Sequence, residues 1–170
     1  MVDKPQAAGR SPRHALRPIG AADDARIAAV LEDAYRATAP DAAAQLLQRA
    51  SAALSVEYSV PRAAYFVVLE AAVVVGGAGL APLYGARSDV CELRHMGVAA
   101  HARSHGAATE LVEHCLVVAL AFGYRHCYAE LTNSMRPALS LLENLRFSRL
   151  NQPVGQTGRF LCDRWYLRDL

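Results

Sequence analysis

The sequence predicts one domain of the mixed α+β class, with a mostly antiparallel central sheet, one parallel strand pair and about four flanking helices. Expected strands follow one another directly before residue 98 and again at the C-terminal end, which favours antiparallel hairpins. One strand–helix–strand unit over residues 90–132 predicts the parallel pair, because parallel strands need a crossover connection. The chain has 170 residues, 53% of them hydrophobic and 20% charged, which suits a single globular core.

The first elements are a short strand and an amphipathic helix. A strand is expected at residues 14–19. Residues 1–12 are expected to form a flexible lead-in, and residues 13–170 the single domain. Asp23 and Asp24 place negative charge in the first turn of the helix, which Ala39-Pro40 ends. The spacing i, i+3, i+4, i+7, i+8 predicts one buried stripe, formed by Ile27, Val30, Leu31, Ala34 and Tyr35.

A second helix is expected after Pro40, with Asp41 as its N-cap. The apolar residues that share one of its faces are Leu46, Leu47, Ala50 and Leu54.

A hairpin follows, with strands at residues 64–70 and 73–80. Its expected turn, Ala71-Ala72, lacks the Gly or Asn that tight turns favour. The run Gly76-Gly77-Ala78-Gly79 predicts a bulge or a close backbone approach in the second strand.

The crossover unit consists of a strand at 90–98, a helix at 105–122 that Gly123 ends, and a strand at 126–132. Leu111, Cys115, Val118 and Phe122 have the spacing of a buried face on that helix. Ser134 is expected to cap the last helix, with Pro137 in its first turn. Two closing strands are expected at 147–150 and 160–167.

The turn Arg103-x-x-Gly106-x-Ala108 stands between the strand at 90–98 and the helix after it. A helix N-terminus has unpaired N–H donors and a partial positive charge, so anions bind there. Gly106 would let the backbone approach a phosphate closely, and Ala108 is small enough to serve the same end. The turn therefore predicts a pyrophosphate site.

Four segments and the element order resemble the GNAT superfamily of acyl-CoA-dependent N-acyltransferases over about residues 14–170. The segments are CELRHM (91–96), LAFGYRHCYAE (120–130), SMRPALSLLENLRF (134–147) and TGRFLCDRWY (157–166). The resemblance implies a GNAT-like sheet whose fourth and fifth strands splay apart to admit acetyl-CoA, the acyl donor. It also implies direct transfer of the acetyl group to an amine, carried by a small molecule or a protein, in a ternary complex.

The same resemblance implies the donor-binding residues. Backbone groups of Met96, Gly97 and Val98 would pair with the pantetheine arm as another strand would. The pyrophosphate would be held by the turn, whose residues are Arg103, Ser104, His105, Gly106, Ala107, Ala108 and Thr109.

The chain departs from the family pattern at several positions. Leu142 stands where many members have a tyrosine that acts as the general acid, and Arg159 where many have a histidine. Arg146 and Ser104 replace glycines, and Ala100 replaces a proline. Loss of the acid would slow turnover without excluding it, since such groups contribute about 10²–10⁴-fold.

Glu92 is the candidate general base, because glutamates on this strand act so in relatives. The alternative is a strand-edge glutamate paired with Arg94 or with solvent. Glu130 is a second carboxylate for which a structural role is favoured. Tyr128 and Tyr166 are further candidates for the acid, although strand tyrosines commonly serve packing. Trp165 suits an acceptor pocket, a dimer contact or the core equally.

No metal site is expected, because His101, His105 and His114 do not supply three or four convergent ligands. Cys91, Cys115 and Cys127 are expected to be core thiols. A net charge of +2 is too small to indicate nucleic acid binding, and no apolar run is long enough for a membrane span. A cytoplasmic location is expected, because no secretory signal is recognised in the sequence and because CoA is intracellular. The resemblance makes a homodimer possible.

Two classes of function follow. The first is an N-acetyltransferase. The second is a weakly active or inactive acyl-CoA-binding sensor, which the altered positions favour, and loss of the donor site altogether is a third outcome.

Overall fold

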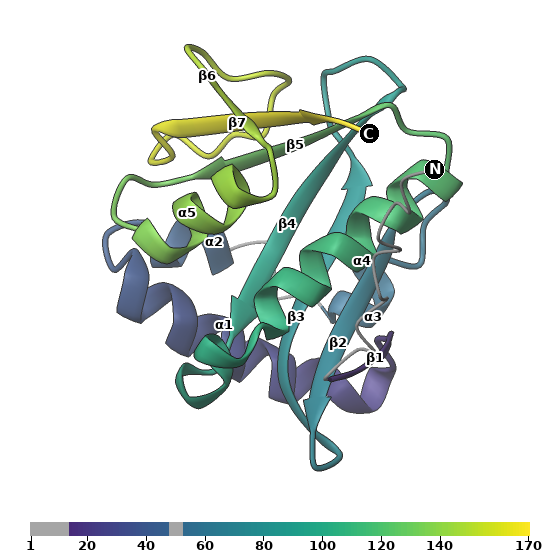
Figure 1. Ribbon diagram of the computed structural model, residues 1–170, viewed down its shortest axis with the longest axis vertical. Helices are drawn as coiled ribbons and strands as arrows, with labels where there is room; N and C mark the ends of the chain where they lie inside the picture. Colours follow the sequence, from purple (N-terminus) through teal and green to yellow (C-terminus); the bar gives the residue numbers. More distant parts are fainter. Residues whose placement is uncertain (1–13, 48–52) are drawn as a thin grey trace, which may run out of the picture.

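The computed structural model describes residues 14–47 and 53–170, in which seven strands form one mixed sheet (Figure 1). The strands are β1 (Ala15–Pro18), β2 (Ala64–Glu70), β3 (Val73–Pro82), β4 (Val90–Val98), β5 (His126–Leu131), β6 (Ser148–Leu150) and β7 (Arg164–Asp169). They lie in the order β1-β2-β3-β4-β5-β7-β6. Only β4 and β5 among these described pairs run parallel. The predicted fold class is confirmed; the lead-in at 1–12 lies outside the described residues.

Helices cover both faces of this sheet, with α4 on one face and α1 and α3 on the other (Figure 1). The α-helices are α1 (Asp24–Thr38), α2 (Ala43–Leu47), α3 (Leu54–Glu57), α4 (Ala107–Ala121) and α5 (Arg136–Asn144), with 3-10 turns η1 (Ala21–Asp23) and η2 (Ala100–His105). All five residues of the predicted α1 stripe are buried. Leu31 of α1 lies against Gly97, while Cys115 of α4 donates to the Ala78 carbonyl from the opposite side.

The expected second helix is wrong in its cap and in its extension to Leu54. Asp41 is exposed and stands two residues before α2 begins, and the described part of α2 reaches Leu47. Leu54 is buried, but in α3, a separate helix; Ala50 lies outside the described residues. The backbone N–H and hydroxyl of Ser55 both donate to the Asp24 carboxylate, at 2.9 and 2.5 Å. A residue distant in sequence therefore stabilises the start of α3.

Two expectations near the C-terminus are also wrong. The N-cap of α5 is Met135, and the hydroxyl of Ser134 bonds that of Thr132 at 2.7 Å instead. Pro137 does lie in the first turn, as expected. The last strand begins at Arg164 and not at Phe160, because residues 151–163 form an irregular loop. The side chain of Phe160 in this loop is 90% exposed.

The glycine-rich stretch of β3 lies beside a bulge in β4. Gly77 pairs with Gly97 and Gly79 with Arg94, so β4 carries one extra residue there. His95 in this bulge has a φ of 52°. A Cβ on Gly77 would lie 2.6 Å from the Tyr65 ring, which explains why this position needs glycine. Close approach is confirmed, although the extra residue is on the partner strand.

The β2–β3 turn is at Ala71-Ala72, where it was predicted. Both alanines have positive φ, 45° and 67°, so they adopt the conformation usually supplied by Gly or Asn. In the part of the chain described, no helix has the length and apolar character to cross a membrane.

Candidate functional site

The parallel strands β4 and β5 separate partway along their length. Their paired positions are Val90 with His126, Cys91 with Cys127, and Glu92 with Tyr128. Beyond Glu92 the bulge turns β4 away, because an extra residue bends the strand that carries it. The sheet therefore opens between its fourth and fifth strands.

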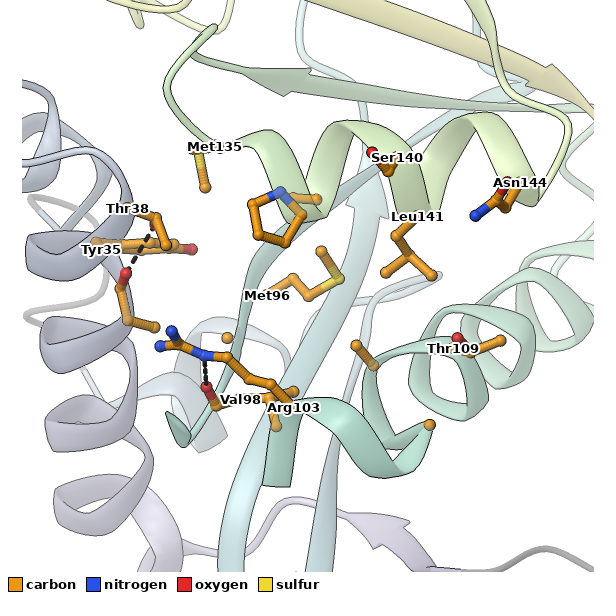
Figure 2. Close-up of a pocket in the computed structure, with 16 residues that line it drawn as sticks. Tyr35, Thr38, Met96, Val98, Arg103, Thr109, Met135, Ser140, Leu141 and Asn144 are labelled. Carbon is orange, nitrogen blue, oxygen red and sulfur yellow. Dashed lines mark hydrogen bonds between the residues drawn. The ribbon is translucent and has the colours of Figure 1, made fainter. Parts of the chain in front are cut away.

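A cavity of about 310 Å³ lies at this opening, between β4, the start of α4, α5 and α1 (Figure 2). The expected donor-binding residues that line it are Met96, Gly97, Val98, Arg103, Gly106, Ala108 and Thr109. The sequence did not single out Thr38, Ser140 and Asn144 as further lining residues. Ala107 is instead fully buried, and His105 is exposed with its Nδ1 3.8 Å from Glu70.

The predicted phosphate turn has the geometry of an anion site. Gly106, the N-cap of α4, has a φ of 89°, which favours glycine. The first intrahelical bond runs from Glu110 N–H to the Gly106 carbonyl. The amides of Ala107, Ala108 and Thr109 precede that bond, so they are donors for an anion. Arg103 Nε donates to the Val98 carbonyl at 2.8 Å, which fixes the turn to β4 (Figure 2).

A second cavity, of about 50 Å³, adjoins the first. Both are lined by Tyr35, Met96 and Met135, so these three side chains form the boundary between them. The polar side chains of the second cavity come from Arg94, His95, Glu130, Arg159 and Tyr35. Molecules bound in the two cavities would therefore meet at these three side chains.

Glu92 is buried beside the second cavity rather than at a solvent-exposed strand edge. Its side chain is 3% exposed and contacts the guanidinium of Arg159. The alternative partner expected for Glu92, Arg94, lies 3.7 Å away. Two arginines therefore neutralise this carboxylate, and Arg159 separates it from the cavity lining.

Glu130 lies on the neighbouring strand and does line the second cavity. Its side chain is 4% exposed and accepts a hydrogen bond from the Thr157 hydroxyl at 2.6 Å. Arg159 Nη2 lies 3.4 Å from the same carboxylate. Burial raises the pKa of Glu130, so this group holds a proton more readily than an exposed glutamate. Sequence reasoning favoured only a structural role for it.

A buried network that the sequence did not reveal supports the bulge. Tyr58 O–H lies 2.8 Å from His95 Nδ1 and accepts a bond from Arg94 Nε at 3.1 Å. Arg94 Nη2 pairs with Glu57 at 2.8 Å, and Tyr65 O–H donates to the His95 carbonyl. Burial raises the pKa of Tyr58 far above its ordinary range, so the phenol stays protonated. No local pattern marks His95, because its role depends on the bulge.

Neither tyrosine weighed as a replacement acid lines either of these two cavities. Tyr128 is fully buried, and Tyr166 O–H donates to Glu143 at 2.8 Å. Leu142 is buried in the wall of the second cavity. Tyr35, predicted only as a core residue, lines both cavities. Figure 2 shows its side chain in the first of them. Burial raises its pKa well above the ordinary value.

The remaining histidines and cysteines lie outside these cavities. His101 Nε2 lies 3.8 Å from Glu70, and the His114 ring packs edge-on against Phe66. The cysteines of the described chain are free and buried: Cys91, Cys115, Cys127 and Cys162. Within residues 14–47 and 53–170, no three or more His, Cys, Asp or Glu side chains are arranged to hold a metal ion.

Comparisons with known proteins show the family and the fold. The model of the acetyltransferase (GNAT) family matches residues 25–147. An Escherichia coli K12 protein described as the uncharacterized N-acetyltransferase YjgM is 39% identical over 113 residues, which cover 66% of this chain and 68% of that protein.

Two solved structures illustrate the similarity of fold. A GNAT-family acetyltransferase from Staphylococcus aureus Mu50 matches with a TM-score of 0.75 at 12% identity, over 92% of this chain and 99% of that one. A Salmonella typhimurium structure, described as the putative acetyltransferase yncA with its cofactor acetyl-CoA, matches with a TM-score of 0.72 at 18% identity. That match covers 94% of this chain and 95% of the other.

Proposed function

This chain belongs to the GNAT acetyltransferase family, and we propose that it transfers the acetyl group of acetyl-CoA to a primary amine. Acetyl-CoA, when bound, supplies an acetyl group activated as a thioester, which an amine converts to an amide with release of the CoA thiol. The acceptor is an amine of a small molecule or of a protein.

The observation that carries this proposal is the cavity at the opening between β4 and β5. Its position and its lining suit the pantetheine arm and the pyrophosphate of the donor. The N–H donors at the start of α4, with Gly106 leaving room, would hold the pyrophosphate. Backbone groups of Met96, Gly97 and Val98 would hydrogen-bond the pantetheine arm. Ser104, His105 and Ala107 contribute to this turn through their positions in the backbone.

Glu92 is proposed as the general base that accepts a proton from the acceptor's ammonium group. The amine nitrogen can attack a carbonyl carbon only after it has lost this proton. Because Glu92 contacts Arg159, the base becomes available when that contact opens. The nitrogen then forms the new C–N bond as the C–S bond breaks. The first proton passes from Glu92 to solvent, and the second, which the nitrogen loses as it becomes an amide, passes to the leaving sulfur to give the CoA thiol.

Tyr35 is proposed to assist the leaving sulfur. Its raised pKa makes it a weak acid, so we assign its hydroxyl a hydrogen bond to the sulfur rather than complete proton transfer. A thiolate is itself a tolerable leaving group. This assignment places a donor at the boundary of the two cavities and compensates for Leu142, which has no proton to give.

Titration calorimetry of acetyl-CoA and CoA into the purified protein tests the donor site. Micromolar binding that is lost in Gly106→Glu supports the proposal, since the new carboxylate would block and repel the pyrophosphate. Glu113→Gln, an exposed change on the outside of α4, is the control for handling and folding. If Gly106→Glu binds acetyl-CoA as tightly as the wild type does, the assignment of the pyrophosphate site to this turn is wrong.

A non-catalytic acyl-CoA sensor is the second candidate, favoured by Leu142 and by the small size of the second cavity. Donor binding without turnover on any amine would support it. We further propose a cytoplasmic location, where acyl-CoA is available, and a homodimer formed through the closing strands.

A further inference from the structure

The guanidinium of Arg159 bridges two buried carboxylates at the second cavity. Its Nη2 contacts Glu92 and lies 3.4 Å from Glu130. The side chains of Glu92 and Glu130 are only 3% and 4% exposed, and that of Arg159 is 11% exposed. Buried carboxylates are costly unless they are protonated or paired with a cation, so a positive group between these two is favourable.

We infer that Glu92 and Glu130 form the subsite for the acceptor's ammonium group, and that Arg159 fills this subsite until the amine displaces it. The inference deepens the proposed function and rests on it. It names the acceptor class as primary alkylamines that carry no carboxylate close to the nitrogen.

The space available supports displacement rather than simple addition. The second cavity measures about 50 Å³, against about 310 Å³ for the first. Arg159 forms part of its wall and contacts Glu92, so an amine that enters this cavity meets the Arg159 side chain before it reaches the Glu92 carboxylate. Removal of that side chain from the wall is the simplest way to enlarge the cavity toward Glu92.

The segment that carries Arg159 is suited to release it. Arg159 follows Gly158, which has a φ of 73°, in the irregular loop between β6 and β7. The next two side chains, Phe160 and Leu161, are 90% and 52% exposed, so they add little apolar burial. Gln45 of α2 holds this segment through the Leu161 N–H at 3.0 Å and the Gly158 carbonyl at 3.5 Å. These polar bonds can be exchanged for water.

Charge explains why the occupant is a cation without a carboxylate. An ammonium that replaces the guanidinium keeps one positive charge between Glu92 and Glu130. An acceptor carboxylate would instead bring a third carboxylate to this cluster. The other arginine of the cavity, Arg94, is already paired with Glu57 at 2.8 Å. A carboxylate-bearing amine is therefore disfavoured.

The test compares two probes that differ by one carboxylate, n-butylamine and 4-aminobutanoate. Thermal unfolding of wild type and Arg159→Ala is followed against the concentration of each probe at constant ionic strength and constant, mildly alkaline pH. We expect n-butylamine to stabilise Arg159→Ala saturably, with a half-saturating concentration about tenfold lower than for wild type, because no side chain has to be displaced. 4-Aminobutanoate should act more weakly on both proteins.

Two variants control the measurement. Arg164→Ala removes a nearby arginine that pairs with Asp163, and should behave as wild type does. The double variant Glu92→Gln/Arg159→Ala should lose the response to n-butylamine, because one of the two carboxylates is neutral. If Arg159→Ala does not fold, Arg159→Gln removes the charge while keeping an amide, and its response is interpreted identically.

The inference is overturned if Arg159→Ala does not respond to n-butylamine. It is also overturned if wild type prefers 4-aminobutanoate and loses that preference in Arg159→Ala, since Arg159 would then recognise a carboxylate. Acetyl-CoA binding, measured separately on each variant, reports on the proposed function. A protein that binds n-butylamine but not acetyl-CoA would retain the amine subsite and lose the proposed activity.

Discussion

The phenol of Tyr58 lies 2.8 Å from Nδ1 of His95, the residue that has a φ of 52° in the β4 bulge. A non-glycine residue at positive φ is strained unless its surroundings hold it there. The bond from Tyr58, together with that from Tyr65 to the His95 carbonyl, provides this restraint. The bulge in turn separates β4 from β5, so a pair of buried hydrogen bonds maintains the opening of the sheet.

Tyr58→Phe is therefore expected to weaken both the fold and donor binding. The change leaves His95 and Arg94 without this hydroxyl, at a cost of about 1–3 kcal/mol in the free energy of unfolding. We expect acetyl-CoA affinity to fall several-fold as the bulge relaxes. Urea unfolding and calorimetric titration measure the two effects. Tyr84→Phe, at a 70%-exposed position, is the control, and equal behaviour of the two variants would argue against the restraint.

Glu92→Gln is expected to lower kcat by about 10²–10⁴-fold with little change in acetyl-CoA affinity. The amide keeps the shape of the side chain and cannot accept the ammonium proton. Steady-state rates with an amine found by screening, and donor titration of the same preparation, separate the two quantities. If this variant has the kcat of the wild type, Glu92 is not the base and another group accepts the proton.

Tyr35→Phe should reduce kcat by about tenfold or more, because the variant loses the hydrogen bond to the leaving sulfur. Donor affinity should change little, since the ring still separates the two cavities. Tyr128→Phe is a matched buried control, as Tyr128 lines neither cavity. Equal rates in the two variants would show that Tyr35 serves packing only.

Stability should depend on pH through Glu130. Burial raises the folded-state pKa of this carboxyl above its ordinary value of 4.5, so the folded protein binds the proton more tightly than the unfolded chain does. The contribution to stability is therefore full below pH 4.5 and is lost as pH rises through the folded-state pKa. Glu130→Gln should lack this loss.

The measurement is the free energy of unfolding in urea at several pH values from about 4 to about 7, for wild type and Glu130→Gln. The difference between the two curves isolates Glu130 from other titrating groups, such as Asp23. Glu32→Gln, at a 49%-exposed side chain, serves as the reference change. Parallel curves for wild type and Glu130→Gln would contradict the assignment.

Periodicity predicted α1 well, because burial of one helix face dictates the spacing of its apolar residues. The limits of β2 and β4 also agree with the sequence, although both strands bury consecutive residues and show no alternation. The caps failed for a different reason. Asp24 supports α3 from another helix, and Ser134 bonds Thr132, so the partner choice depends on tertiary contacts.

The candidate site also contains a part that the sequence could predict and a part that it could not. The phosphate turn was predictable because Gly106 and its neighbours form one continuous segment. The cluster of Glu92, Glu130 and Arg159 was not, because these residues come from β4, β5 and a loop. Glu92 was selected on resemblance alone, and Arg159 was noticed only as a departure from the family pattern. Side chains that converge from separate segments leave no local signature.

The Ala71-Ala72 turn offers a route to a more robust protein. Both alanines are in the left-handed region, which costs an L-residue about 1–2 kcal/mol relative to glycine. Neither residue lines either cavity. Replacement by Asn-Gly, the pair preferred in such turns, would relieve this cost. Substitution at this hairpin is therefore a way for protein engineering to raise the thermal stability of the protein without altering the residues that line the two cavities.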